Sequence, residues 1–346
     1  MTPHLHTSGH SSPYCFKTRA EQMAINISRR HEAIRIATTP LPGSLLCDHF
    51  KPVHVPKECD GKTLLDALCH VVQSMPSAYW IAECEQGLVL HEKHGPAAAA
   101  RIVRGGERYI HKVAGVTEPD VNGRVEIIHE DEAVIVINKP APLPVHPGGR
   151  FYRNTLRHIL NEVYHPQKPR PVHRLDANTT GIMIMARTRH SAGLLQKQFT
   201  GRSVGKFYLV RVQGIPTDDS FSCHVPISPE SSALGARLVD WETGLTAETH
   251  FRILRRDSDG TALLEARPIT GRTNQIRIHL SHLGFPICGD ATYLHGGQIG
   301  GTQTLPVDSP PLCLHAWRIT CLHPLTGEPL EFTAAPPESW GTLGSA

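Results

Sequence analysis

A run of five apolar residues, Ile182 to Ala186, most strongly limits how this chain can fold. The run is far too short to cross a bilayer, and its pattern predicts a strand buried inside a sheet. The segment directly before it is polar and reads PVHRLDANTTG from Pro171 to Gly181. Asp176 therefore lies beside a rigid strand, where the scaffold can hold its carboxylate still and leave it open to a substrate.

A lone aspartate in a loop is usually a solvated turn residue, so a functional Asp176 needs support from elsewhere in the chain. Two later segments supply it: Gly205 to Val210 reads GKFYLV, and Gly271 to Leu280 reads GRTNQIRIHL. Together the three segments offer a carboxylate, several cations and an aromatic ring.

In content and order these segments resemble the RluA-type pseudouridine synthases, which isomerise uridine in RNA. His173 to Asp176, with Thr179 to Gly181, is similar to the HRLD segment of that family. The other matching positions are Lys206 and Tyr208 (the K-x-Y strand), Gly271 to His279 with Gly289, Asp290 and Tyr293 (the G-R-T-H-Q-I-R-x-H and G-D-x-x-Y block), and Asn138 to Pro140, Val145 to Pro147 and Asn154 to Leu156 (the first motif). The resemblance spans residues 120 to 335, roughly two thirds of the chain.

The resemblance implies a reaction and a catalytic set. Making pseudouridine breaks the bond between ribose C1′ and uracil N1 and joins C1′ to C5, so we expect no cofactor and no metal ion. Asp176 would be the nucleophile at C1′, a role that carboxylates have in retaining glycosidases. Arg272 would pair with Asp176 and keep it ionised. Tyr208 would stack on the uracil, and its hydroxyl is the best candidate for moving the C5 proton.

A uridine in folded RNA must leave its stack before C1′ is accessible. Arg174 resembles the family's residue that braces the gap, although a surface phosphate contact would also explain it. His173 is expected to orient the loop rather than to do chemistry. Lys139 and His146 could contact phosphates or simply cap turns. The expected RNA-binding set is His173, Arg174, Lys206, Lys139 and Arg277.

One position departs from the family pattern. The family usually has His where this chain has Asn274. Asparagine also donates a hydrogen bond but does not titrate near neutral pH, so an acid or base role at this position is in doubt.

The distribution of charge agrees with an RNA partner better than the total does. The net charge is only +3, but residues 170 to 211 contain eight basic residues against one acid, Asp176. Such basic residues often simply occupy the solvent-exposed side of a helix and a strand and bind no ligand. The later segment adds three basic residues with no acid among them: Arg267, Arg272 and Arg277. Together the two segments favour a cleft that binds a polyanion.

Composition sets the remaining limits. A chain of 346 residues with 40% hydrophobic and 19% charged residues predicts about two globular domains and no membrane span. Nine cysteines without a C-x-x-C pair indicate free thiols in a reducing compartment, so we expect a cytoplasmic protein. We also expect the protein to act as a monomer.

The chain is expected to divide into three parts. Residues 1–45 show only a weak helical stretch near Ala20 to Ile36 and predict a flexible or loosely docked arm. Residues 46–118 are similar in element order to an S4-type RNA-binding domain, and a degenerate, weakly binding copy is an equal alternative. Residues 119–340 predict an α+β catalytic domain with a mixed, mostly antiparallel sheet.

Two rival classes of function remain. A noncatalytic RNA-binding protein would explain the basic segments but would have no use for the lone acid Asp176. A glycosidase acting on a small nucleoside would need a second carboxylate as its acid, and the nearest candidates, Glu265 and Asp290, lie outside both key motifs. The sequence does not identify the RNA; ribosomal and transfer RNA both fit.

Overall fold

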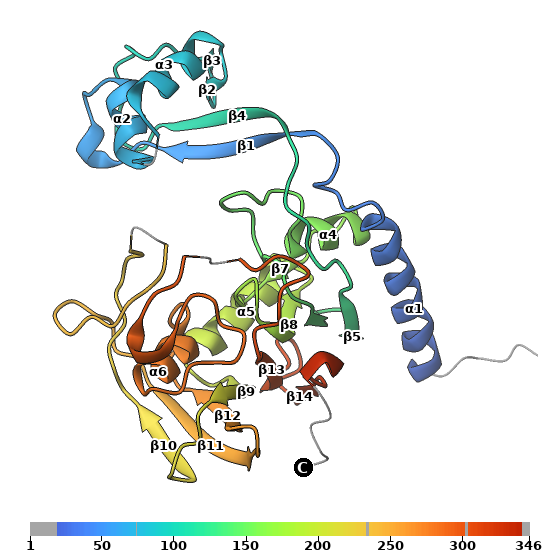
Figure 1. Ribbon diagram of the computed structural model, residues 1–346. Helices are drawn as coiled ribbons and strands as arrows, with labels where there is room; N and C mark the ends of the chain where they lie inside the picture. Colours follow the sequence, from blue (N-terminus) through green and yellow to red (C-terminus); the bar gives the residue numbers. More distant parts are fainter. Residues whose placement is uncertain (1–18, 74, 233–234, 302–303, 341–346) are drawn as a thin grey trace, which may run out of the picture.

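The computed structural model describes residues 19–340 except 74, 233–234 and 302–303. Figure 1 shows a large domain built on a sheet, the helix α1 beside it, and a smaller unit at the end of the long strands β1 and β4. The predicted boundary near residue 118 falls just after β4, where the chain enters the large domain.

The large domain is centred on a ten-stranded sheet in the order β10-β11-β12-β9-β13-β8-β6-β5, with β14 on β13 and β7 on β8. Among the described strands of this sheet, the β8–β13 pairing is parallel and the others are antiparallel, which confirms the predicted α+β class with a mixed sheet. The strands are β5 Glu126–Glu130, β6 Val134–Lys139, β7 Arg170–Pro171, β8 Thr180–Ala186, β9 Gly205–Gln213, β10 Ser220–Cys223, β11 Thr249–Arg256, β12 Thr261–Pro268, β13 Leu314–Leu322 and β14 Pro329–Thr333. The helices of this domain are α4 Leu156–Val163, α5 Arg189–Thr200 and α6 Gln275–His282, with the short 3-10 turns η2 His295–Gly297 and η3 Glu338–Trp340.

The apolar run in β8 is buried because both faces of the sheet are covered. Successive residues of a strand point to opposite faces. Met183 and Met185 join the core that includes α4, whereas Ile182 and Ile184 join the core that includes α5. A strand covered on both faces has no polar positions, and this explains the unbroken run in the sequence.

Gly181 allows β8 and β13 to approach each other at the start of β8. Its φ is +113°, and a Cβ atom at this position would overlap the carbonyl oxygen of Ala316 in β13. The close approach brings the preceding loop, which carries Asp176, to the middle of the sheet.

Most locally encoded elements agree with the sequence patterns. Thr188 accepts a hydrogen bond from Ser191 N at the start of α5, and Gly201 follows the end of the helix. Thr155 caps α4 in the same way. Helix α6 begins differently: Asn274 precedes it in a left-handed conformation with φ +58°.

Residues 46–118 form a compact unit with a core of its own. Its four-stranded sheet has the order β1-β4-β2-β3, and Trp80 and Tyr109 are among its fully buried side chains. Thr63 and Asp66 form a reciprocal capping box at the start of α2. The elements are β1 Cys47–His54, η1 Lys57–Cys59, α2 Leu64–Val71, α3 Ser77–Glu85, β2 Val89–His91, β3 Gly95–Pro96 and β4 Arg108–Val116.

The described part of the expected arm is a helix docked on the large domain, not a flexible segment. Helix α1, Arg19–Ala37, packs against the large domain, and its Ile34 is 3% exposed in the core that includes α4. Arg30 forms an ion pair with Glu130 (3.3 Å) and lies 4.0 Å from the ring of Tyr164. The low hydrophobicity of α1 gave no sign of this contact in the sequence, because the contact depends on a few polar and apolar side chains. Residues 1–18 lie outside the described range.

None of the helices in the described part of the chain is long and apolar enough to cross a membrane. The cysteines described, residues 47, 59, 69, 84, 223, 288, 313 and 321, are all free thiols.

Two buried histidines predict a loss of stability in acid. Burial lowers the pKa of His279 and of His315 from 6.5 to about 4. Between these values the unfolded chain binds more protons than the folded one, so stability is present above pH 6.5 and is lost as the pH falls towards 4. Urea unfolding should show about 2 kcal/mol less stability per histidine at pH 5 than at pH 7. The loss should be smaller in His315→Gln but unchanged in the exposed control His190→Gln; equal losses would contradict this assignment.

Candidate active site

A cavity of about 490 Å³ opens beside the loop between β7 and β8. Its walls come from this loop, from α5 and β9, and from the segment that leads from β12 into α6. Seven of the predicted site residues line it: His173, Arg174, Asp176, Lys206, Tyr208, Arg272 and Arg277. The structure therefore brings the three motifs together.

Asp176 lies at the centre of the loop, with its side chain 22% exposed. The backbone oxygen of Asp176 accepts a hydrogen bond from Thr179 N, which closes the turn into β8. The carboxylate is thus held on a fixed turn and remains accessible from the cavity.

The predicted ion pair between Arg272 and Asp176 is wrong. Among the ion pairs of the described residues, Asp176 is paired with Arg277, at 3.7 Å between Oδ2 and Nη1. Arg272 instead donates from Nε to Thr246 O at 3.0 Å. The reason is geometric: Arg277 lies in the first turn of α6, close to Asp176, whereas Arg272 lies before the helix on the side of residue 246.

Arg277 is itself anchored by a second carboxylate. It is 3% exposed and donates from Nε and Nη2 to the two oxygens of Asp290, at 2.8 and 2.7 Å. Burial opposes the charge, but the pair with Asp290 more than offsets it, so the pKa of Arg277 is raised. The guanidinium therefore stays charged and fixed beside Asp176.

Tyr208 lies on β9 and lines the cavity. Burial, with a smaller contribution from the charge of Asp176, raises the pKa of its hydroxyl. The hydroxyl is therefore protonated at neutral pH and able to donate a hydrogen bond.

The basic residues of the cavity differ in exposure. Arg174 is exposed at its rim. Lys206 is largely buried, which lowers its pKa, and donates from Nζ to Thr270 O at 3.2 Å. The ring of His173 stacks on Phe199, and its Nε2 accepts a hydrogen bond from Ile184 N; burial lowers its pKa to about 3, so the ring is neutral. This geometry agrees with an orienting role for His173.

Lys139 cannot make the RNA contact predicted for it. Its side chain is fully buried, and Nζ donates to the carbonyl oxygens of Pro140, Leu143 and Ala177 at 2.8 to 3.1 Å. Burial lowers its pKa to about 7, opposed by the charge of Asp176. Lys139 therefore braces the backbone directly after the candidate nucleophile.

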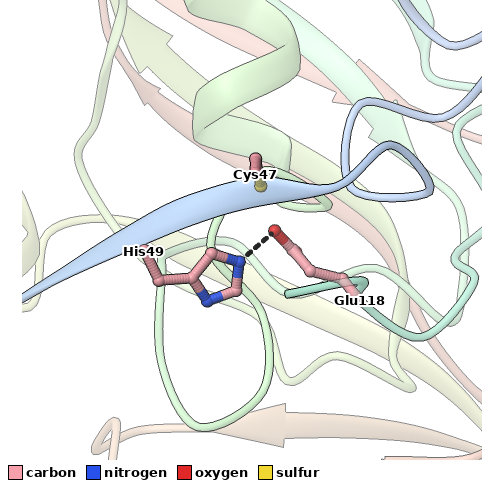
Figure 2. A group of neighbouring side chains, drawn as sticks. All are labelled: Cys47, His49 and Glu118. Atoms are coloured by element: carbon pink, nitrogen blue, oxygen red, sulfur yellow. Dashed lines mark ion pairs between the residues drawn. The ribbon is translucent and has the colours of Figure 1, made fainter. Parts of the chain in front are cut away.

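Figure 2 shows a buried cluster of Cys47, His49 and Glu118, where the small unit joins the large domain. Their potential metal-ligand atoms lie within 4.8 Å of one another. However, the Glu118 carboxylate already accepts three backbone N–H bonds, from residues 152, 153 and 154, at 2.8 to 2.9 Å. These hydrogen bonds connect the end of the small unit to residues 152–154 of the large domain. The sequence patterns did not indicate this role for Glu118.

The chain is similar to known proteins over the region that contains this cavity. The family described as RNA pseudouridylate synthase matches residues 133–282, the region that contains β6 to α6. The chain is 33% identical over 298 residues to ribosomal large subunit pseudouridine synthase D of Nitrosomonas europaea, covering 84% of this chain and 85% of that protein. It is 34% identical over 241 residues to human pseudouridylate synthase RPUSD2; that match covers 68% of this chain but only 44% of the human protein.

The solved structure of human RNA pseudouridylate synthase domain containing 1 is similar in fold. The TM-score is 0.50 at 25% identity, covering 62% of this chain and 84% of that one. The mixed sheet and these matches define the class of the large domain, an α+β fold of the pseudouridylate synthase type. The chain belongs to the RNA pseudouridylate synthase family, of the RluA type.

Proposed function

We propose that this protein is an RNA pseudouridine synthase that isomerises specific uridines in structured ribosomal or transfer RNA. The proposal rests on the Asp176 carboxylate, which lies 3.7 Å from Arg277 in a cavity that Tyr208 also lines, within the region matched by the family. The relative from Nitrosomonas europaea is named for the large ribosomal subunit, which makes RNA of that subunit the first substrate to test.

The residues of the cavity divide the reaction between them. Asp176 attacks or stabilises the positive centre that develops at C1′ as the bond to N1 breaks and its electron pair passes to the uracil. Arg277 supplies a fixed positive charge 3.7 Å from the carboxylate. Tyr208 contacts the uracil while it turns over, and its hydroxyl assists transfer of the C5 proton after C1′ joins C5. The atoms of substrate and product are the same, so the reaction requires no cofactor.

Basic residues around the cavity bind the RNA in this proposal. Arg174 is exposed next to Asp176, so it is placed to brace the stack after the uridine flips out. Arg202 and Arg272 also line the cavity and give it a positive field for phosphates. The unit of residues 46–118 serves as an S4-like RNA-binding module in this proposal, and the protein acts in the cytoplasm as a monomer.

Mapping of pseudouridine in RNA tests this function directly. Purified protein is incubated with ribosomal and transfer RNA from cells that lack it, and pseudouridine is mapped at single-nucleotide resolution. We expect a small set of uridines to convert without any added cofactor. Binding of RNA without conversion at any site would favour a noncatalytic RNA-binding protein.

A further inference from the structure

Asn274 occupies an unusual place at the start of α6. Its backbone is left-handed, with φ +58° and ψ +17°, and its side chain makes no capping hydrogen bond to the helix. Asparagine tolerates this conformation better than most residues. The side chain is only 9% exposed and is turned towards the cavity, so its amide must find partners there.

The neighbours of the amide fix its orientation. With its nitrogen towards Asp176, the amide donates to Oδ2 at 2.7 Å and lies 3.2 Å from Oδ1, and its oxygen accepts from the Tyr293 hydroxyl at 2.7 Å. The opposite orientation would place the amide oxygen against the carboxylate oxygens, which are acceptors only. The Tyr293 oxygen in turn accepts from Arg237 N at 3.1 Å. Its single hydroxyl proton points to the amide oxygen at 2.7 Å in this orientation, rather than to Arg237 O at 3.1 Å.

We infer that Asn274 is a positioning residue for Asp176: its amide holds the carboxylate at the angle required for attack on C1′. This inference rests on the proposed function, since it presumes that Asp176 acts on the ribose. Arg277 supplies the charge near Asp176, and Asn274 supplies the short directional hydrogen bond. Because an amide does not titrate, Asn274 offers its N–H donor at every pH.

Three variants test the role. Asn274→Ala removes the donor, and we expect kcat to fall about 10- to 100-fold while KM for RNA changes less than about threefold. Asn274→His keeps a donor and tolerates the left-handed backbone, so it should retain activity within about tenfold of the wild type. A change confined to KM, or a histidine variant as poor as alanine, would overturn the inference.

Asn274→Asp adds a readout that a merely structural role would not affect. Two adjacent carboxyls repel when both are ionised, which raises the pKa of one of them, and the protonated form can again donate to its neighbour. The groups facing this pair are Arg277, Tyr293, Tyr208 and Lys139. Because the buried Lys139 has its pKa lowered to about 7, the quantity to measure is the ratio of variant to wild-type activity at each pH. This ratio should rise at least about tenfold from pH 8 to pH 5.5; a flat ratio would overturn the inference.

A measurement without catalysis separates this inference from the proposed function. In ¹⁵N-labelled protein, the side-chain amide signal of Asn274 is assigned with the Asn274→His variant and followed on Asp176→Ala. A large shift of this signal, with the amides of exposed asparagines unchanged, supports the hydrogen bond even if no RNA is converted. An unshifted signal overturns the positioning role whatever the activity assay shows.

Discussion

Asp176→Asn is expected to reduce pseudouridine formation by at least about 10³-fold while leaving RNA binding and fold intact. An amide has nearly the shape of the carboxylate but carries no charge and is a poor nucleophile at C1′. Because the side chain is only partly buried, at 22% exposed, the change should not disturb the core. Single-turnover conversion of an RNA with one mapped site measures the chemical step, and filter binding measures affinity.

Asp218→Asn is the matched control for this variant. Asp218 is an exposed acid on the connection between β9 and β10, so its replacement removes the same charge far from the catalytic loop. We expect its conversion rate to equal that of the wild type. If Asp176→Asn converted RNA at the control rate, the carboxylate would not be the nucleophile, and the cavity would have another role.

The position of Asp176 could be predicted because its signals are local. The unbroken apolar run of β8 follows from burial on both faces, and the polar segment before it could only be a loop at the end of that strand. The caps of α4 and α5 are local in the same sense, since each threonine bonds a backbone N–H three residues ahead.

The partner of Asp176 could not be predicted, because tertiary packing decides it. Arg272 and Arg277 both flank the start of α6, and the motif contains both. Residues three apart lie on the same side of a helical turn, so the spacing of Asn274 and Arg277 indicates that they are neighbours. The spacing does not show that both face Asp176. Lys139 shows the same limit: its sequence context fits a phosphate contact, but its three carbonyl partners are brought together only by the fold.

The large effect expected of Arg277→Met follows from that partner assignment. The change leaves the fully buried carboxylate of Asp290 without its cation, and breaking one side of a buried ion pair costs about 3–5 kcal/mol of folding stability. It also removes the charge beside Asp176, so activity should fall by at least about 100-fold in protein that remains folded. Urea unfolding and single-turnover conversion measure the two effects.

Arg272→Met distinguishes this arrangement from the one expected of the sequence motif. Within the described part of the chain, the partly exposed Arg272 side chain makes its hydrogen bond to the backbone oxygen of Thr246, so its loss should cost less than about 1 kcal/mol of stability. Its effect should be mainly on RNA affinity, because it lines the cavity as a phosphate-binding cation. If Arg272→Met abolished conversion at saturating RNA while Arg277→Met retained it, Arg272 would be the functional partner of Asp176 in the RNA complex, and α6 would have to rearrange when RNA binds.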